Sequence, residues 1–560
     1  MKLRIHGGAG TVTGSCFELA DERLGVRVLV DAGAFQGEDG SAISGAPSLP
    51  DDPSSLNAVL LTHAHLDHCG RLPLLVRAGY RGKVYATPAT ATLARATLLD
   101  SARLSGEFSA ADVDGIRWHT RNVSAYQGWR PVADDVFLCP IRSSHLLGAT
   151  GFAVSWGRAG VANPVVVFSG DLGPARKGDG VEPLCAPNHA VDFAASAPRV
   201  TLVLESTYGA RAESPRSRLE RQAALADLVR RAARRGGPLL LAAFAQGRTQ
   251  ELLMDLAELR SRAPDLAAIP LAAPGFGLAL EASKAYVAHL LETEIVPRRH
   301  EVRVANANRE RFRAMGIDVT TADGMARARA VLACAFGLGP SVEGVQPPRL
   351  LSKADIAAFV SGGPAILVAP SGMAQGGAMR QALERALPDP KATVAFSGYV
   401  SRGTAGDVLL SMGLLSFEDR HRLDGDVWTE GGARARRADV RAAIVRLECY
   451  SAHASAEQLC DYALPSAGRN GAPARVPDRV LLVHGDAPNR RALARRLATH
   501  VAERCLSVEI LLPEPDTGWI DLDGPGGNAL SVPDISRRLD DLRHTDPLRF
   551  AEILRMLKAS

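Results

Sequence analysis

The first 200 residues alternate between short apolar runs and glycine-rich turns. Apolar runs bounded by turn residues are typical of buried strands. This pattern predicts strands at residues 27–30, 58–61, 84–86, 136–138, 152–154, 165–168 and 200–204. A helix is expected between two of them, at residues 90–101. The first part of the chain is therefore predicted to be rich in strands, with helices in some of the connections.

From about residue 215 the pattern changes to Ala-, Leu- and Arg-rich helices that alternate with apolar strands. Residues 218–235 form a predicted amphipathic helix that ends at a glycine pair and precedes a strand at 238–242. Further strands are predicted at 365–368 and 393–396. Because alternation of strand and helix is typical of a parallel α/β domain, we expect a second domain in the middle of the chain.

Strands return at residues 443–447 and 480–483, and the tail from about residue 530 is charged and helical in pattern. A chain of 560 residues is too long for one hydrophobic core, in agreement with two or more domains. With 46% hydrophobic and 22% charged residues, the composition is that of an ordinary globular protein. The net charge of +4 permits a polyanionic partner without requiring one.

Neither a membrane segment nor a secreted protein is expected. The uncharged apolar runs are far shorter than the roughly 20 residues that a membrane helix needs. The first residues lead into glycines rather than into an apolar signal region. The eight cysteines are scattered without a C-x-x-C pair, which argues against a zinc ribbon or a disulfide framework. We therefore expect reduced thiols and a cytoplasmic location.

A cluster of histidines follows the predicted strand at 58–61 and indicates a metal site. His63, His65, Asp67 and His68 lie within six residues of one another. His63 and His65 are two apart, so on a continuing strand both side chains point to one face. Asp67 and His68 begin the next turn and cannot converge on the same point. The spacing therefore predicts two metal ions, and a two-metal hydrolase if the rest of the chain supplies the missing ligands.

Other metal-capable side chains lie where predicted strands meet loops, several of them beside glycine. They are Asp31, His145, Asp171, His453 and His484. Each taken alone is more often a capping or packing residue than a ligand. The set as a whole, in order along the chain, favours a shared site at the strand ends.

A series of short motifs indicates which protein family this pattern resembles. Beside Asp31 and the histidine cluster, the chain carries Gly-Thr-Val-Thr-Gly-Ser at 10–15, Glu-Ser-Thr-Tyr-Gly at 205–209, Gly-Arg-Thr-Gln-Glu at 247–251, Pro-Ser-Gly-Met at 370–373, Gly-Tyr at 398–399, Ser-Ala-His at 451–453 and Val-His-Gly at 483–485. The ordered series resembles the metallo-β-lactamase-fold hydrolases, and within them the β-CASP nucleases, which include RNase J and the endonuclease of pre-mRNA 3′-end processing.

The resemblance implies an α/β fold, an αββα metallo-β-lactamase sandwich with an inserted β-CASP α/β domain. The expected boundaries are 1–209 for the first part of the sandwich, 210–420 for the β-CASP domain, 421–510 for the second part of the sandwich and 511–560 for a C-terminal helical extension.

The resemblance also implies roles for individual residues and two Zn²⁺ ions per chain. One zinc is expected on His63, His65 and His145, and the second on Asp67, His68 and His484, with Asp171 bridging the two. Asp31 is expected to orient a ligand histidine. His453 is expected to protonate the leaving oxygen with Glu205 orienting it, and Asp67 is counted with this catalytic group. Ser371 and Gly372 are candidate phosphate contacts.

The chain departs from the family pattern at two places. Ser455 replaces the aspartate that usually follows the histidine motif, and we expect it to cap the next helix instead. Residues 273–279 replace an Asp-Ser-Pro-Leu-Ala-like segment, which puts any substrate contact there in doubt. The predicted metal ligands show no substitution.

The leading function is metal-dependent hydrolysis of RNA phosphodiester bonds, with single-stranded RNA as the substrate. The family's RNA-acting members tend to have histidine where His484 lies, whereas its DNA-repair members have valine. A DNA nuclease is the alternative of the same class, and a non-catalytic RNA-binding scaffold is the alternative without catalysis. A small-molecule hydrolase would not need the insertion at 210–420. The sequence does not distinguish an endonuclease from a 5′ exonuclease. It does not fix the oligomeric state either, for which a homodimer is one option.

Overall fold

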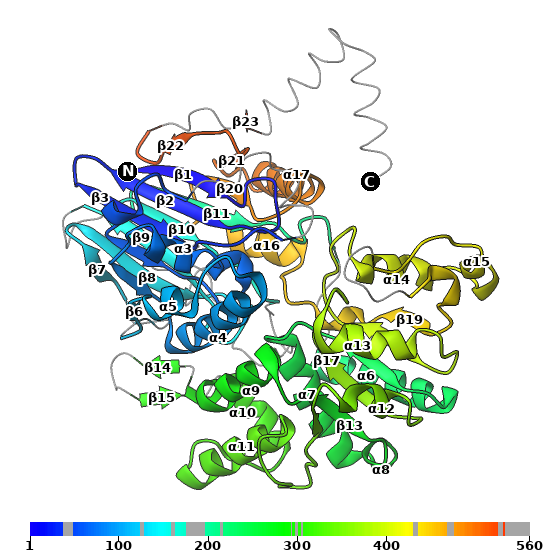
Figure 1. The fold of residues 1–560 in the computed structure, drawn as a ribbon. Coiled ribbons are helices and arrows are strands. Elements are labelled where there is room, and N and C mark those ends of the chain that lie inside the picture. Colours follow the sequence, from blue (N-terminus) through cyan, green and yellow to red (C-terminus); the bar gives the residue numbers. More distant parts are fainter. Residues whose placement is uncertain are drawn as a thin grey trace.

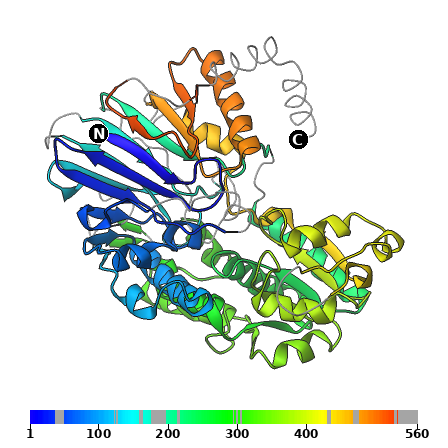
Figure 2. The ribbon, with the colours of Figure 1, turned by 45° about the horizontal axis from the view of Figure 1, so that its top comes forward.

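The computed structural model describes the chain except for residues 37–48, 122, 124–127, 158–162, 175–196, 213–216, 293, 297–300, 304–305, 429–434, 467–474, 525–529 and 532–560. The described chain forms a two-sheet sandwich, drawn in blue, cyan and orange in Figure 1, and a second α/β part in green and yellow. Figure 2 shows the same two parts after a rotation of the molecule. None of the described helices has the length and apolar character needed to cross a membrane.

The first sheet of the sandwich has seven strands in the order β22-β1-β2-β3-β4-β5-β6. These strands are β1 (Lys2–Gly7), β2 (Cys16–Asp21), β3 (Val26–Val30), β4 (Ala58–Leu60), β5 (Lys83–Tyr85), β6 (Trp118–His119) and β22 (Trp519–Asp521). Strand β4 lies between β3 and β5 with parallel pairing on both sides. A strand covered on both faces needs apolar residues at every position, which explains its uninterrupted apolar run.

The second sheet has eight strands in the order β23-β21-β20-β11-β10-β9-β8-β7. These strands are β7 (Arg130–Ala133), β8 (Val136–Arg142), β9 (Thr150–Trp156), β10 (Val165–Phe168), β11 (Val200–Glu205), β20 (Arg479–Val483), β21 (Glu509–Leu512) and β23 (Leu530–Ser531). Although β11 and β20 are far apart in sequence, they pair in parallel with Glu205 opposite Val483.

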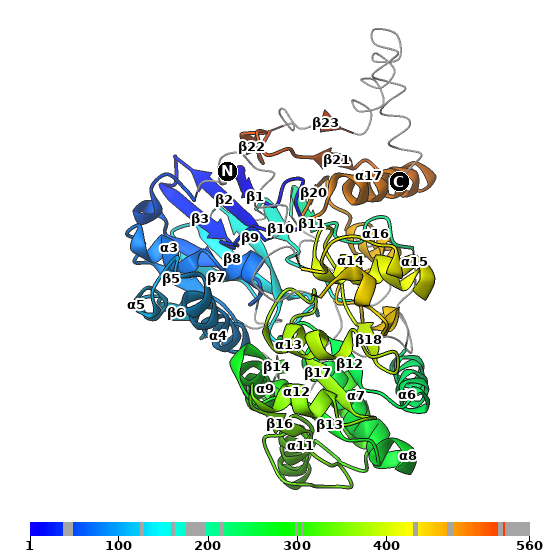
Figure 3. The same cartoon turned by 45° about the vertical axis from the view of Figure 1, so that its right-hand side comes forward.

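Side chains from the facing sides of the two sheets form the core of the sandwich. Leu3 and Leu19 of the first sheet belong to one buried cluster with Phe152 and Phe168 of the second. Helices cover the outer faces, as Figures 1 and 3 show for α4 and α17. The covering helices are α3 (Leu72–Arg77), α4 (Pro88–Ser105) and α5 (Ala110–Asp114) on the first sheet, and α16 (Ala456–Ala463) and α17 (Ala487–Glu503) on the second. The layers are therefore the predicted αββα sandwich.

The inserted part is built on a six-stranded sheet in the order β16-β13-β17-β12-β18-β19, with parallel pairing throughout. Its strands are β12 (Leu239–Ala242), β13 (Leu271–Pro274), β16 (Arg349–Leu351), β17 (Ile366–Ala369), β18 (Thr393–Phe396) and β19 (Ala443–Arg446). A separate hairpin pairs β14 (Glu294–Val296) with β15 (Glu301–Arg303).

Helices connect the parallel strands, as a parallel sheet requires. They are α6 (Arg218–Arg235), α7 (Arg248–Arg262), α8 (Pro264–Ala267), α9 (Gly277–His289), α10 (Asn306–Ala314), α11 (Ala322–Ala335), α12 (Asp355–Val360), α13 (Gly377–Ala386), α14 (Ala405–Gly413) and α15 (Phe417–His421). Helix α6 has the predicted bounds because Ser217 forms a capping box at its start and Gly236 adopts the left-handed conformation at its end. Helix α9 packs against α4 of the sandwich.

The sheets extend past two of the expected domain boundaries. Strand β19 belongs to the six-stranded sheet although it lies beyond residue 420, and β22 pairs with β1 although it lies beyond residue 510. We therefore propose that the inserted domain extends to about residue 447 and that the sandwich continues to about residue 523. The predicted helical tail falls on residues 532–560, outside the described residues.

Candidate metal centre and active site

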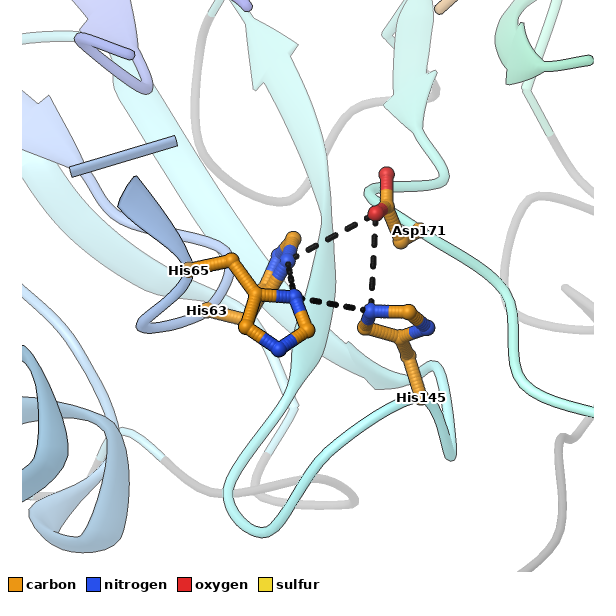
Figure 4. A group of neighbouring side chains, drawn as sticks. All are labelled: His63, His65, His145 and Asp171. Carbon is orange, nitrogen blue, oxygen red and sulfur yellow. Dashed lines mark hydrogen bonds and ion pairs between the residues drawn. The ribbon is translucent and has the colours of Figure 1, made fainter. Parts of the chain in front are cut away.

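Four predicted ligands converge at the edge of the sandwich. Figure 4 shows the rings of His63, His65 and His145 and the carboxylate of Asp171 turned toward one another. The Nδ1 atom of His65 lies 3.1 Å from Nε2 of His63 and 3.0 Å from Nε2 of His145. Asp171 Oδ2 lies 3.6 Å and 3.5 Å from the same two Nε2 atoms. Four donors at about 2.0–2.2 Å from a tetrahedral zinc lie about 3.3 Å apart, so this group fits a zinc ion.

A second group of ligands lies directly beside the first. His68 Nε2 is 3.2 Å from His484 Nε2, which is 3.5 Å from Asp67 Oδ2. The other oxygen of Asp171, Oδ1, is 3.2 Å from His68 Nε2. That oxygen is buried and makes no hydrogen bond to any described residue. The two oxygens of Asp171 therefore face the two ligand groups, one each.

Strand ends bring these residues together. Asp31 follows β3, and the segment that begins at Thr62 follows β4. Asp171 follows β10 and His484 follows β20, while His145 precedes β9. Parallel strands present their carboxyl ends at one edge of a sheet, so residues distant in sequence meet there.

The backbone at the site is held in an unusual conformation. Asp31, Ser144 and His484 have positive φ angles of 60°, 58° and 47°, which residues other than glycine rarely adopt. Such residues persist where the surroundings fix them, commonly at functional sites. Gly33 lies so close to the ligand turn that a Cβ atom there would be 1.6 Å from the Asp67 carbonyl oxygen. The turn carrying Asp67 and His68 therefore depends on glycine at position 33.

Hydrogen bonds to the far nitrogen of the ring orient two of the ligand histidines. His68 Nδ1 lies 2.8 Å from Asp31 Oδ2, and His145 Nδ1 donates to the Ala452 carbonyl oxygen at 3.0 Å. These bonds leave the Nε2 lone pairs directed at the ligand groups. Carboxylates and carbonyls that accept from the other nitrogen orient histidine ligands in this way in metal sites. Asp31 is itself fixed because its Oδ1 accepts a bond from the Thr62 backbone N–H at 2.8 Å.

Burial keeps the first group of histidines neutral. It lowers the pKa of His65 to about 4 and holds the pKa values of His63 and His145 well below their usual range. Only a neutral imidazole has a lone pair to offer a metal ion. The set is therefore ready to bind a cation at neutral pH.

Glu205 and His453 form a pair next to the two ligand groups. Glu205 Oε1 is 3.1 Å from His453 Nδ1, and the same carboxylate accepts backbone N–H bonds from Leu172 and Thr207, both at 3.0 Å. Burial disfavours the charged imidazole, but the carboxylates of Glu205, Asp171 and Asp67 together outweigh it and raise the pKa of His453 above its usual value. His453 Nε2 lies 3.9 Å from Asp171 Oδ2, so the free side of the ring faces the ligand groups.

The loop that carries His453 is attached to the inserted domain. Tyr450 donates from its hydroxyl to Asp255 Oδ2 at 2.8 Å. Asp255 is fully buried and also pairs with Arg221 at 3.1 Å and Arg311 at 2.6 Å. Sequence reasoning did not find this cluster, although Tyr450 directly precedes the Ser-Ala-His motif. Ser455 caps helix α16 through a capping box, as predicted.

A cavity of about 540 Å³ lies over the ligand groups, between the sandwich and the inserted domain. The sandwich contributes Asp67, His145 and His453 to its lining, and the inserted domain contributes Arg248 and Met373. Of the two candidate phosphate contacts, Ser371 and Gly372, neither lines this cavity, although both precede Met373 in the loop after β17.

Comparison with known protein families assigns both parts of the chain. Residues 13–229 match the metallo-beta-lactamase superfamily, and residues 249–409 match the Beta-Casp domain. The ribonuclease TTHA0252 of Thermus thermophilus is 31% identical over 510 residues, which cover 90% of this chain and 98% of that protein. The chain therefore belongs to the β-CASP family of metallo-β-lactamase-fold proteins, as its motifs predicted.

Two further relatives come from other branches of life. The endoribonuclease ysh1 of Schizosaccharomyces pombe is 26% identical, over 91% of this chain and 57% of its own length. The transcription termination factor FttA of Thermococcus kodakarensis is 26% identical, over 78% of this chain and 58% of its own length. The matched part of this chain thus spans little more than half of the length of each of these two proteins. Together with the bacterial relative, they place the protein in the class of metal-dependent nucleases, and the fold implies a divalent metal at the His/Asp cluster.

Proposed function

We propose that the protein is a two-zinc ribonuclease that hydrolyses phosphodiester bonds of single-stranded RNA. The observation that carries this proposal is the pair of adjoining ligand groups, each faced by one oxygen of Asp171, with the Glu205–His453 pair beside them. Two metals would be held by His63, His65 and His145 and by Asp67, His68 and His484, with Asp171 between them. When bound, such a pair supplies an activated water and positive charge next to the reacting phosphate.

The residues of the chain supply the remaining chemistry. His453 holds a proton on Nε2, the nitrogen that faces the ligand groups, and donates it to the departing oxygen. Glu205 accepts a hydrogen bond from the Nδ1–H group of His453. This bond fixes the orientation of the ring and the tautomer of the imidazole. Since Glu205 is locked by two backbone N–H groups, the imidazole is oriented before a substrate binds.

His484 supports RNA rather than DNA as the substrate, because the RNA-acting members of the family tend to have histidine at this position. The names of the relatives point the same way, since one is a ribonuclease and another an endoribonuclease. We also propose a cytoplasmic location, because the eight cysteines are scattered along the chain without the spacing of a disulfide framework, which suits a reducing compartment.

The test is an assay of matched RNA and DNA oligonucleotides, each labelled at either end. We expect cleavage of RNA with little or no cleavage of DNA of the same sequence. Release of the 5′ label as a mononucleotide indicates a 5′ exonuclease. Labelled fragments of intermediate length, seen with either label, indicate an endonuclease. Cleavage of DNA at an equal rate would contradict the RNA assignment.

Metal analysis tests the two-metal part of the proposal. Protein purified without chelator should contain about two zinc ions per chain, since a two-metal mechanism needs both. Replacing Asp31, which orients His68, with asparagine should weaken zinc binding about 10- to 100-fold, which is the usual effect of losing such a partner. A zinc content near zero in the unaltered protein would exclude the proposed centre, and a content near one would restrict it to one group.

A further inference from the structure

The cavity over the ligand groups has an aromatic wall that the proposed metal chemistry does not use. Tyr208, Phe244, Tyr286 and Tyr399 all line it. Tyr208 comes from the sandwich, directly after the Glu205 segment, and the other three come from the inserted domain. A mainly apolar pocket with a few charged groups at one end suits a ligand that has both a flat apolar part and a charged part.

Tyr208 has a fixed position next to the candidate acid. Its ring centre is 5.6 Å from that of His453, and the two rings meet edge to face at 69°. The preceding residue, Thr207, lies 3.0 Å from His484 Nδ1 through its hydroxyl oxygen, so the backbone there is tied to the candidate metal site. The guanidinium carbon of Arg211 lies 5.1 Å from the centre of the Tyr208 ring. The ring therefore lies next to the imidazole that would donate the proton.

Tyr399 continues this wall from the inserted domain. Its ring centre is 6.2 Å from that of Tyr208, with 56° between the ring planes. The loop before it packs closely on Phe244, because a Cβ atom at Gly398 would be 3.0 Å from the edge of the Phe244 ring. The two tyrosines are too close for a base to enter between them. They form an angled wall, on which a flat group can stack against one ring and touch the edge of the other.

We propose that Tyr208 and Tyr399 form a stacking site for the base of the nucleotide that carries the leaving oxygen. This inference rests on the proposed ribonuclease function and adds a substrate contact to it. The leaving oxygen must lie near His453, and Tyr208 is the tyrosine whose ring meets the His453 imidazole. Aromatic stacking accepts any base, so the site contributes affinity without sequence selection. A base can reach this wall only when it is unstacked from its neighbours, which favours single-stranded substrates over duplexes.

Tyr399 is the better residue to test, because its loop follows β18 and lies outside the two ligand groups and the Glu205–His453 pair. We expect Tyr399→Leu to lower kcat/KM on a single-stranded oligoribonucleotide about ten-fold, in line with the loss of one base–aromatic stack. Tyr399→Phe should keep most of the activity, since it keeps the ring. Trp519→Leu removes a partly exposed aromatic ring on β22, outside the cavity lining, and should change nothing.

An abasic substrate separates stacking from general packing. An abasic site placed at the nucleotide that carries the leaving oxygen, which the product ends identify, should slow the unaltered enzyme about ten-fold. The Tyr399→Leu enzyme should be much less sensitive to that abasic site, because only the Tyr208 side of the stacking site remains. The stacking site would be overturned if the effects of Tyr399→Leu and of the abasic site multiplied. It would also be overturned if an abasic site on the other side of the cut slowed the unaltered enzyme equally.

Binding provides a readout that does not depend on cleavage. The same oligonucleotides, titrated by fluorescence anisotropy with a chelator present, should show the same ten-fold weakening for Tyr399→Leu and for the abasic site. Absence of cleavage by the unaltered enzyme would count against the proposed function, and the binding titration would still decide the stacking site. Equal Kd values for Tyr399→Leu and the unaltered protein would contradict it.

Discussion

Replacing His453 with alanine should lower kcat on RNA by about 10²- to 10⁴-fold, the usual contribution of a general acid. His453 lies beside both ligand groups but belongs to neither, so the zinc content should stay unchanged. Its Nδ1 contacts Glu205 at 3.1 Å, and its Nε2 faces the ligand groups. The loss should therefore fall on the chemical step rather than on metal or substrate binding, and KM should change little.

The matched control is a substrate whose leaving group needs no proton. Bis(p-nitrophenyl) phosphate releases a nitrophenolate, which departs as an anion at neutral pH. His453→Ala should retain most of its activity on this ester while losing activity on RNA. Glu205→Gln should act in the same direction, because the amide cannot draw the Nδ1 proton as a carboxylate does. An equal loss on both substrates would show that His453 supports the metal centre instead of donating a proton.

Replacing Asp255 with asparagine should lower the free energy of unfolding by about 3–5 kcal/mol, the usual cost of leaving a buried charge without its partner. Asp255 pairs with two buried guanidinium groups, Arg221 and Arg311, and accepts a hydrogen bond from the Tyr450 hydroxyl; Arg311 also pairs with the buried Glu258 at 2.7 Å. Urea unfolding measures the change. The matched control is Asp265→Asn, which breaks an exposed pair with Arg230 and should leave the stability unaltered within error.

The effect of Asp255→Asn should depend on pH. Burial would raise the pKa of Asp255, but the neighbouring Arg221 and Arg311 outweigh it and hold that pKa below its usual value. A carboxylate with a lowered native pKa stabilises the fold fully above its unfolded pKa of about 4. That contribution is lost as the pH falls through the native pKa. The difference between the two proteins should thus be constant near pH 7 and shrink in acid; a difference that grows in acid would contradict the assignment.

The local part of the metal site could be predicted from sequence, and its long-range part only through family motifs. The spacing of His63, His65, Asp67 and His68 already implies two groups of ligands, because strand and turn geometry separates the pairs. Their partner His484 directly follows β20, and it reaches the site only because β20 pairs with β11. Nothing in the residues around 484 reveals that pairing. The ordered series of motifs supplied it instead.

Other features escaped prediction because local patterns do not reveal burial. Asp255 and Arg221 lie on charged, amphipathic helices, where charged residues usually face solvent, yet both are buried against Tyr450. The end of the inserted domain was also hard to place, because the short strand β19 gives no sign of which sheet it joins. The motif that contains Ser371 and Gly372 predicted a phosphate contact, whereas the structure shows only the adjacent Met373 at the cavity.

The pairing of β11 with β20 also bears on when the enzyme becomes active during its synthesis. On the proposed ligand assignment, a ribosome-bound chain that has not yet reached residue 484 lacks a ligand of the second metal. His453 is likewise added late, after the whole inserted domain has been made. On that assignment, a nascent chain lacks a complete active site until residue 484 has been made. The site is assembled only when β20 has paired with β11, so the order of the proposed ligands along the chain delays activity until both parts of the sandwich exist.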